Sequence, residues 1–231
     1  MATARAAAAG QRGSRQPAAP RLKISEIFLS LQGEGRHTGW PTVFVRLTGC
    51  PLRCVWCDTA YAFSGGRWMS QDDVLAAVQA QGVARVCVTG GEPLAQRACL
   101  PLLTRLCDAG LAVSLETSGA LDVSAVDPRV ERVLDLKAPG SGESVRNHWP
   151  NLDVLTARDQ IKFVLASRED YDWARRQIAA HALAGRCELL FSPVQGVLDP
   201  AQLADWMLQD RVPARFQMQI HKVLWGDVRG R

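Results

Sequence analysis

Gly-Cys-Pro-Leu-Arg-Cys-Val-Trp-Cys-Asp, at residues 49–58, places Cys50, Cys54 and Cys57 in one loop directly after an apolar, β-rich run. Spacing this tight lets a single loop supply three thiolates to one metal cluster. Structural zinc sites and electron-transfer clusters usually take four protein ligands. A cluster held by this loop alone would therefore keep one metal open to an external ligand, which is a catalytic feature.

Short β-rich runs alternate with segments of helical period around this loop, which favours parallel βα units over an antiparallel sandwich. A complete eight-stranded barrel takes about 250 residues, more than the roughly 210 that follow residue 20. The sequence therefore predicts an α/β fold, an incomplete TIM-like barrel, in a single domain over residues 21–231. Its strands are expected at roughly 24–31, 42–48, 85–89, 111–117, 130–136, 160–165, 187–191 and 214–220.

Three helices carry start signals. Ser70 is a predicted N-cap, and Asp199-Pro200 opens a helix near 200–209. The third helix is expected over 168–184 with Ser167 as its cap. The apolar faces of the first and third are Val74, Leu75 and Val78, and Tyr171, Ala174, Ile178 and Ala182. Residues 137–151 form the one long loop between predicted elements and are a candidate lid.

Charge and composition exclude several classes of protein. The net charge of +4 is mild, and nucleic-acid binding is not indicated. No apolar run reaches the length of a membrane span, and the Ala-, Gly- and Pro-rich residues 1–20 lack a secretory signal. We expect a cytoplasmic protein with a disordered tail at residues 1–20. Much of the charge arises there and next to it, at Arg5, Arg12, Arg15 and Arg21.

The seven cysteines do not indicate a disulfide framework, because their number is odd and three of them are crowded into one loop. This usage is typical of a reducing compartment. The other four lie among apolar neighbours and are expected to be small core residues: Cys87, Cys99, Cys107 and Cys187.

Polar residues follow several predicted strands, where the carboxyl ends of parallel strands meet at one mouth. The glycines of Gly90-Gly91-Glu92-Pro93 let the backbone approach a ligand closely, and the Glu92 carboxylate offers acceptors to an ammonium group. Ser114 and Glu116 share one face of a strand. Later strands end in Asp135-Leu136-Lys137 and Ser192-Pro193-Val194-Gln195. Each of these groups could also be ordinary solvation of a strand end.

The cysteine triplet, with Trp56 before its last member, and the Gly-Gly-Glu-Pro segment together resemble the radical SAM superfamily. The resemblance implies that Cys50, Cys54 and Cys57 hold a 4Fe-4S cluster whose open iron binds S-adenosylmethionine (SAM). The alternative is a zinc knuckle completed by a distant residue such as His37. The resemblance also implies SAM contacts at Gly90, Gly91, Glu92, Ser114, Glu116, Lys137, Ser192 and Gln195.

Five further segments are similar to the 7-carboxy-7-deazaguanine synthase family, in the right order from about residue 23 to 226. They are Leu31-Gln32-Gly33-Glu34-Gly35, Phe44-Val45-Arg46, Cys57-Asp58-Thr59, residues 159–164 and Gln219-Ile220-His221-Lys222. This resemblance implies conversion of 6-carboxytetrahydropterin to 7-carboxy-7-deazaguanine with loss of ammonia, in the pathway that leads to queuosine. It also implies a homodimer, a magnesium ion and an external electron donor such as flavodoxin.

The resemblance places the pterin on Gln32, Glu34 and Gly35. A carboxylate such as Glu34 can accept a pair of N–H donors, and Gln32 can both donate and accept. The pterin's own carboxylate is expected at Arg46 and His221.

The same resemblance places magnesium at Thr59. As alternatives, Gln32 and Glu34 stabilise a glycine turn, Arg46 pairs with Asp58, and His221 is a core residue at a strand end. Two other functions stay open: an activase that makes a glycyl radical on a partner protein, and a binding module in which a cluster or zinc ion staples the loop.

Overall fold

The structure of the chain is a computed structural model that describes residues 20–231. Apart from Pro20, the predicted tail at 1–20 lies outside the described residues. Within the described part of the chain, no helix is long and apolar enough to cross a membrane.

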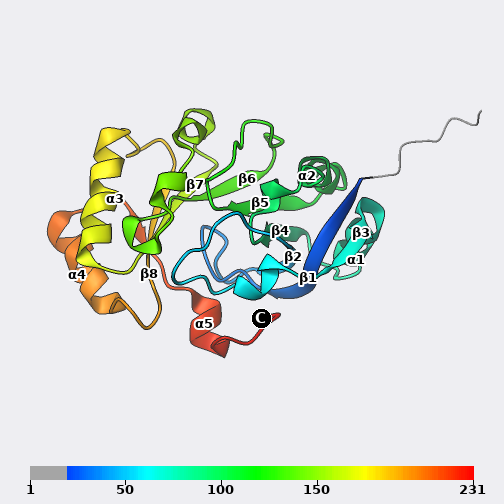
Figure 1. Cartoon of the computed structure of the whole chain (residues 1–231), viewed down its shortest axis with the longest axis horizontal. Coiled ribbons are helices and arrows are strands. Elements are labelled where there is room, and N and C mark those ends of the chain that lie inside the picture. Colours follow the sequence, from blue (N-terminus) through cyan, green and yellow to red (C-terminus); the bar gives the residue numbers. More distant parts are fainter. Residues whose placement is uncertain (1–19) are drawn as a thin grey trace, which may run out of the picture.

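Nine strands form one continuous sheet in the order β3-β1-β2-β4-β5-β6-β7-β8-β9 (Figure 1). The long first strand, β1 (Arg21–Leu31), pairs antiparallel with β2 (Pro41–Leu47) and β3 (Arg67–Ser70). From β2 onward every neighbouring pair is parallel. The parallel strands after β2 are β4 (Arg85–Gly90), β5 (Ala112–Thr117), β6 (Glu131–Asp135), β7 (Gln160–Leu165), β8 (Glu188–Pro193) and β9 (Arg215–Phe216).

Because β3 and β9 are edges that do not pair with each other, the barrel is open, and the predicted incomplete barrel is confirmed. The strand β3 was not expected from the sequence. It is four residues long and is added outside β1, against the segment Arg21–Ile24.

Helices cover the outer face of the sheet. Figure 1 shows α1 (Gln71–Gln79) beside β1 and β3 and α2 (Cys99–Asp108) beside β5, with α3 (Arg168–Ala180) and α4 (Pro200–Asp210) on the side of β7 and β8. The caps are those predicted. The Ser70 side chain accepts a hydrogen bond from the Asp73 N–H and Ser167 accepts one from Asp170, while Asp199 caps α4. The third helix ends earlier than predicted, because Ala182 has φ +47° and is exposed.

The last predicted strand, 214–220, is wrong beyond Phe216. The Gln217 N–H still bonds to the Phe191 carbonyl at 2.9 Å, but the Ile220 N–H bonds to the Gly33 carbonyl at 3.1 Å. The chain therefore leaves β8 and crosses to the turn after β1. There Ile220 begins the short helix α5 (Ile220–Trp225) instead of ending a strand.

The core lies between the helices and the outer face of the sheet, and Cys99 is fully buried in it while Cys107 and Cys187 are packed against it. Cys87 is also buried but faces the barrel interior, between Gln32 and Ser114, and burial raises the pKa of its thiol to about 12. Cys87 and Cys99 are therefore buried, as expected of small core residues, whereas Cys107 and Cys187 are only partly buried.

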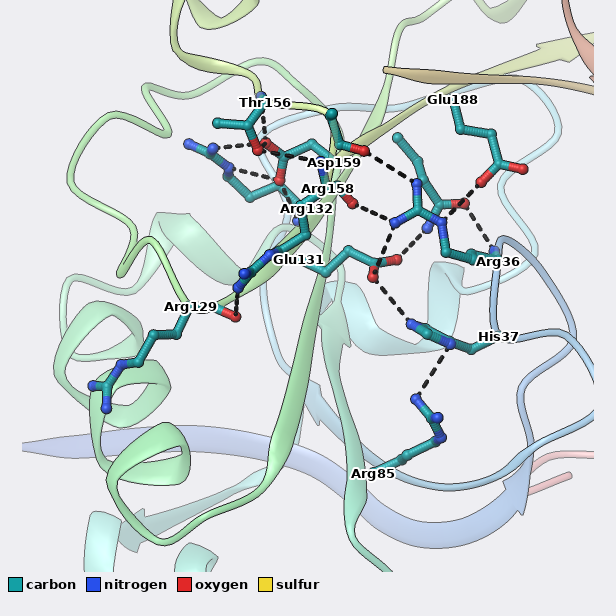
Figure 2. A network of polar contacts seen from close by, with 12 residues as sticks. Arg36, His37, Arg85, Arg129, Glu131, Arg132, Thr156, Arg158, Asp159 and Glu188 are labelled. Carbon is teal, nitrogen blue, oxygen red and sulfur yellow. Dashed lines mark hydrogen bonds and ion pairs between the residues drawn. The ribbon is translucent and has the colours of Figure 1, made fainter. Parts of the chain in front are cut away.

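A network of charged side chains lies at the amino ends of the strands (Figure 2). The Glu131 carboxylate binds His37 Nε2 at 3.0 Å and lies 3.7 Å from Arg36, which also binds Glu188 at 3.2 Å. Beside them the Asp159 carboxylate accepts two hydrogen bonds from the Arg132 guanidinium, at 2.7 and 3.0 Å. We call this set of residues the barrel floor: Arg36, His37, Glu131, Arg132, Asp159 and Glu188.

Candidate active site

A cavity of about 360 Å³ opens at the other end of the barrel, where the carboxyl ends of the parallel strands meet. Its lining includes most residues predicted for the site. The predicted cluster and magnesium residues that line it are Cys50, Cys54, Cys57 and Thr59. The predicted SAM contacts that line it are Gly90, Gly91, Glu116, Lys137 and Gln195. The predicted pterin contacts that line it are Gln32, Glu34, Arg46 and His221. Four predicted residues do not line it: Gly35, Glu92, Ser114 and Ser192.

The cysteine loop begins after β2 and is held by backbone contacts on both sides. The Gly49 N–H bonds to the Ala62 carbonyl at 2.8 Å, and the Gly49 carbonyl accepts from the Glu92 N–H at 2.8 Å. From the predicted lid, residues 137–151, the Ser141 carbonyl accepts from the Val55 N–H at 3.0 Å and Glu143 accepts from the Arg53 N–H at 2.5 Å. The lid segment is thus packed on the cysteine loop, and a closing motion stays a prediction.

The two glycines after β4 permit this packing. A Cβ at Gly90 would collide with the backbone of Leu47, and one at Gly91 would collide with the Gly49 carbonyl and lie 2.7 Å from the Cys50 Cβ. The glycines therefore bring the end of β4 against the start of the cysteine loop. Glycine is therefore needed at these two positions for packing against the loop, in addition to the predicted close approach to a ligand.

All seven cysteines, which lie between residues 50 and 187, are free thiols, and burial raises the pKa of Cys50 and Cys54. Among residues 20–231 no group of three His, Cys, Asp or Glu side chains could hold a single metal ion. His37 belongs to the barrel floor, at the opposite end of the strands. These observations speak against a zinc knuckle. Three half-buried thiols around one cavity fit the wider span of a 4Fe-4S cluster.

Glu92 makes a set of buried hydrogen bonds that the sequence did not predict. Its carboxylate is fully buried and accepts hydrogen bonds from the Leu94 N–H at 3.0 Å, the Thr117 hydroxyl at 2.9 Å and the Ser118 N–H at 2.7 Å. Because its acceptor positions are taken, Glu92 ties the end of β4 to the end of β5 and leaves no carboxylate oxygen for an ammonium group. Thr117 and Ser118 lie at the end of the neighbouring strand β5, and the sequence around Glu92 alone could not predict these contacts.

Three other predicted residues lie beside the cavity. Ser114 is deeper in the barrel and lines a second cavity of about 240 Å³ toward the barrel floor. Ser192 is buried, and its hydroxyl has no hydrogen-bond partner among residues 20–231. Gly35 makes a turn with φ +72°, and its N–H binds the Gln217 side chain at 2.8 Å. Gly35 is therefore held in the turn that follows β1.

Glu34 is surrounded by donors. Gln219 Nε2 donates to its Oε1 at 2.5 Å, and Lys162 Nζ donates to its Oε2 at 2.6 Å. Burial alone would raise the pKa of Glu34, but the charge and hydrogen bond of Lys162 lower it, so the carboxylate is ionised at neutral pH. Lys162 and Gln219 were in the segments singled out by sequence but were assigned no role there.

Arg46 pairs with Glu26, at 2.6 Å, and not with Asp58. The Tyr61 hydroxyl donates to the same Glu26 oxygen at 2.8 Å. Asp58 instead binds Lys222 at 2.8 Å. Burial opposes its ionisation, but the Lys222 charge and hydrogen bonds lower the pKa of Asp58 to about 2. The alternative pairing of Arg46 with Asp58 is therefore wrong.

His221 lies in the first turn of α5, and its ring fills the space beside Gly33, where an added Cβ would fall on the imidazole. Burial lowers the pKa of His221, so the ring is neutral at pH 7. A neutral imidazole at this place can donate or accept one hydrogen bond to a ligand in the cavity.

The Radical SAM superfamily matches residues 44–185, which include the cysteine loop and strands β4 to β7. With its partial parallel barrel and three thiols at the mouth, the chain is a radical SAM enzyme. It therefore takes a 4Fe-4S cluster and SAM.

Relatives identify the family within that class. The 7-carboxy-7-deazaguanine synthase of Chlorobaculum tepidum is 47% identical over 213 residues, covering 90% of this chain and 97% of the relative, and that of Koribacter versatilis is 43% identical, covering 88% and 97%. The crystal structure of QueE from Escherichia coli superposes with a TM-score of 0.67 at 26% identity, covering 86% of this chain and 93% of that one. The chain belongs to the 7-carboxy-7-deazaguanine synthase family.

Proposed function

We propose that this enzyme converts 6-carboxy-5,6,7,8-tetrahydropterin to 7-carboxy-7-deazaguanine with loss of ammonia, in the pathway that leads to queuosine. The observation that carries the proposal is that one cavity joins the three cysteines to the ionised Glu34 and to Arg46. The first group suits the radical initiator, and the second suits a ligand with an N–H-rich edge and a carboxylate.

Glu34 is suited to the aminopyrimidinone edge of a pterin. Each of its oxygens already holds one donor, from Gln219 or Lys162, and keeps a further acceptor position. The carboxylate can thus accept two neighbouring N–H groups of the ligand, in charge-assisted bonds. Gln32 holds the turn, since its Oε1 accepts from the Glu34 N–H at 3.3 Å.

Arg46 and His221 are assigned to the pterin carboxylate. The Arg46 Nε bond to Glu26 fixes the orientation of the guanidinium and leaves its other N–H groups for a ligand. Neutral His221 adds one hydrogen bond from α5, beside Gly33. Two contacts from separate elements would fix the angle at which the ring system lies.

Cys50, Cys54 and Cys57 are assigned to the cluster, and Gly90, Gly91, Glu116, Lys137 and Gln195 to SAM. When bound, the cluster and SAM would supply the radical chemistry for hydrogen abstraction at C6 of the pterin. The chain contributes position and exclusion of wrong reactants, since a misplaced radical is quenched by its neighbours. Lys137 is held for this by Asp135, at 3.0 Å.

Magnesium is assigned to Thr59, whose hydroxyl lies on the cavity and donates to Asp58 at 2.7 Å. One hydroxyl and one carboxylate are a partial shell, so substrate oxygens and water would complete an octahedron. In Thr59→Ala we expect the magnesium concentration for half-maximal activity to rise on the order of tenfold. Activity titrated with magnesium checks this, and an unchanged titration would remove Thr59 from the metal site.

An external electron donor such as flavodoxin and a homodimeric state belong to the same proposal. Val55, on the cysteine loop, is 77% exposed, which leaves the outer side of the loop accessible to a donor protein. Reduction by candidate donors and sedimentation of the purified protein address these two points separately.

The function is tested by anaerobic turnover of the iron-reconstituted protein with SAM, dithionite, magnesium and 6-carboxytetrahydropterin. Mass spectrometry should detect a product lighter than the substrate by one ammonia. If SAM is cleaved while the pterin persists, the cluster assignment stands and the substrate is wrong, which is also the result expected of a glycyl-radical activase. One zinc and no iron per chain would exclude the radical chemistry.

A further inference from the structure

Lys162 is the most heavily shared cation in the cavity. It is the third of the six residues of β7, its side chain is 10% exposed, and its Nζ lies 2.6 Å from Glu34 Oε2 and 3.3 Å from Glu116 Oε2. Asp135 Oδ2 is 3.8 Å away. The three carboxylates come from different parts of the sheet: the turn after β1, β5 and β6. A single ammonium therefore joins elements that are far apart in the chain.

The other cavity carboxylates have cations of their own. Asp135 lies 3.0 Å from Lys137 and Asp58 lies 2.8 Å from Lys222. Glu26, outside the cavity lining, lies 2.6 Å from Arg46. Among the described residues, Glu34 and Glu116 make ion pairs with Lys162 alone. Two carboxylates that are 11% and 17% exposed thus share one positive charge, and each would repel the other without it.

The residue type suits this place. Three of the chain's four lysines line the cavity, whereas most of its cations are arginines elsewhere. An ammonium is a compact charge with three donors that can bond carboxylates from different directions, whereas a guanidinium is a planar fork. Burial would lower the pKa of Lys162, but the surrounding carboxylates raise it well above its ordinary value, so the bridge stays charged.

We propose that Lys162 is a positioning residue that sets the spacing between the two ligands, because it ties Glu34, on the pterin side, to Glu116, on the SAM side. This inference rests on the proposed function for the identity of the ligands. Without the ammonium the two carboxylates repel and move apart. The pterin C6 then no longer lies against the SAM 5' carbon, and a radical formed there takes its hydrogen from another source.

The expected signature is uncoupling rather than loss of binding. In Lys162→Met, SAM should still be cleaved in the presence of pterin, but product formed per 5'-deoxyadenosine released should fall on the order of tenfold or more, since misplacement of about 1 Å can cost a hundredfold in rate. A purely structural role for Lys162 would lower both events together through loss of folded protein and leave their ratio unchanged.

The experiment measures both products in one anaerobic reaction of the reconstituted enzyme, by mass spectrometry. Lys23→Met is the matched control, since Lys23 is the one lysine outside the cavity lining, and it should keep the wild-type ratio. Lys162→Arg retains the charge, and so the fold, but replaces the compact bridge by a wider fork; it should also uncouple the reaction, and it decides the question if Lys162→Met does not fold.

The outcomes separate the two proposals. If wild type makes product and both Lys162 variants keep the wild-type ratio, the spacing role is overturned while the proposed function stands. If wild type cleaves SAM but makes no deazaguanine product, the proposed function fails, and the assignment of Lys162 to a pterin site fails with it. A lowered ratio in the Lys162 variants with an unchanged ratio in Lys23→Met supports the proposal.

Discussion

Glu34 is the residue on the pterin side of the cavity whose side chain and backbone are both held by hydrogen bonds. Its carboxylate is held by Gln219 and Lys162 from two different elements, and its backbone N–H is held by Gln32. This leaves the side chain little freedom of its own. A ligand that meets it loses little additional entropy in ordering the protein, and that favours a rigid, planar partner such as a pterin ring.

Replacing Glu34 by Gln should separate pterin binding from SAM binding. The amide keeps the shape but loses the charge, and charge-assisted hydrogen bonds are worth about 1.5–3 kcal/mol, so the Kd for pterin should rise on the order of 30-fold. The Kd for SAM, measured without pterin, should change less than about threefold. Equilibrium binding of each ligand to the oxidised holoenzyme checks this, and equal losses for both would contradict the assignment.

Single residues were predictable where chemistry follows from position along one strand. The cysteines, Glu34 and Arg46 stand beside strand ends and do line the cavity. Pairings between elements were not predictable. Lys162 and Glu34 are 128 positions apart in the chain, and only the sheet order brings them together. The hydrogen bonds of Glu92 were not predictable for the same reason, since its partners Thr117 and Ser118 lie at the end of a different strand.

At the scale of elements, the junction of β4 with the cysteine loop positions the first thiol. The Gly91 N–H bonds to the Leu47 carbonyl at 3.2 Å and the Glu92 N–H to the Gly49 carbonyl at 2.8 Å, so the loop continues the ladder between β2 and β4. A loop anchored to the sheet in this way holds its ligands more firmly than one tied only by side chains.

Gly91→Ala should therefore weaken cluster binding. The added Cβ would lie 2.7 Å from the Cys50 Cβ and against backbone, so the loop must move. Overpacking of this kind costs about 1–3 kcal/mol, which corresponds to a loss of cluster affinity on the order of tenfold. Iron and sulfide content after limited reconstitution measures it.

The control for this substitution is Gly185→Ala, where an added Cβ meets no atom within 4 Å although φ is +79°. That variant carries backbone strain without touching the loop, and should bind as much iron as wild type. Full iron content in Gly91→Ala would show that the loop accommodates the methyl group, and the glycine pair would then serve the ligand alone.

Elements with strong apolar patterns were predicted well, and weakly patterned ones were not. The interior strands β4 to β8 begin and end within two residues of expectation because both of their faces are covered. The last segment failed because Phe216, Met218 and Ile220 alternate like a strand. What ends the strand is a hydrogen bond from Ile220 to Gly33, a contact between the two ends of the sheet that no local pattern encodes.

At the scale of the whole molecule, the two ends of the barrel have different roles. The carboxyl ends carry the cavity, and the amino ends carry the barrel floor, where charges are paired with one another (Figure 2). An open barrel does not gain the stability of full closure, so cross-strand ion pairs at the floor help to keep β6, β7 and β8 in register. Their strength should show in stability and not in ligand binding.

The Asp159–Arg132 pair is suited to testing whether the barrel floor contributes to stability. The two side chains are 1% and 8% exposed. Burial opposes ionisation of Asp159, but hydrogen bonds from Arg132 and from backbone N–H groups lower its pKa below its ordinary 3.8. A lowered pKa in the folded state means that the carboxylate stabilises the fold above the unfolded-state pKa of about 3.9. That stabilisation is lost as the pH falls further, toward the folded-state pKa.

Asp159→Asn leaves Arg132 buried without its counter-charge, which should lower the free energy of unfolding at pH 7 by about 3 kcal/mol and the melting temperature by roughly 9 °C. Below pH 4 the gap between variant and wild type should narrow, because wild type then loses the same charge pair. Thermal unfolding followed by circular dichroism at both pH values measures the gap. Asp205→Asn, on the exposed face of α4, is the control and should melt like wild type. A gap of equal size at both pH values would mean that Asp159 acts through shape and hydrogen bonds alone, and the charge would then have no part in holding the floor together.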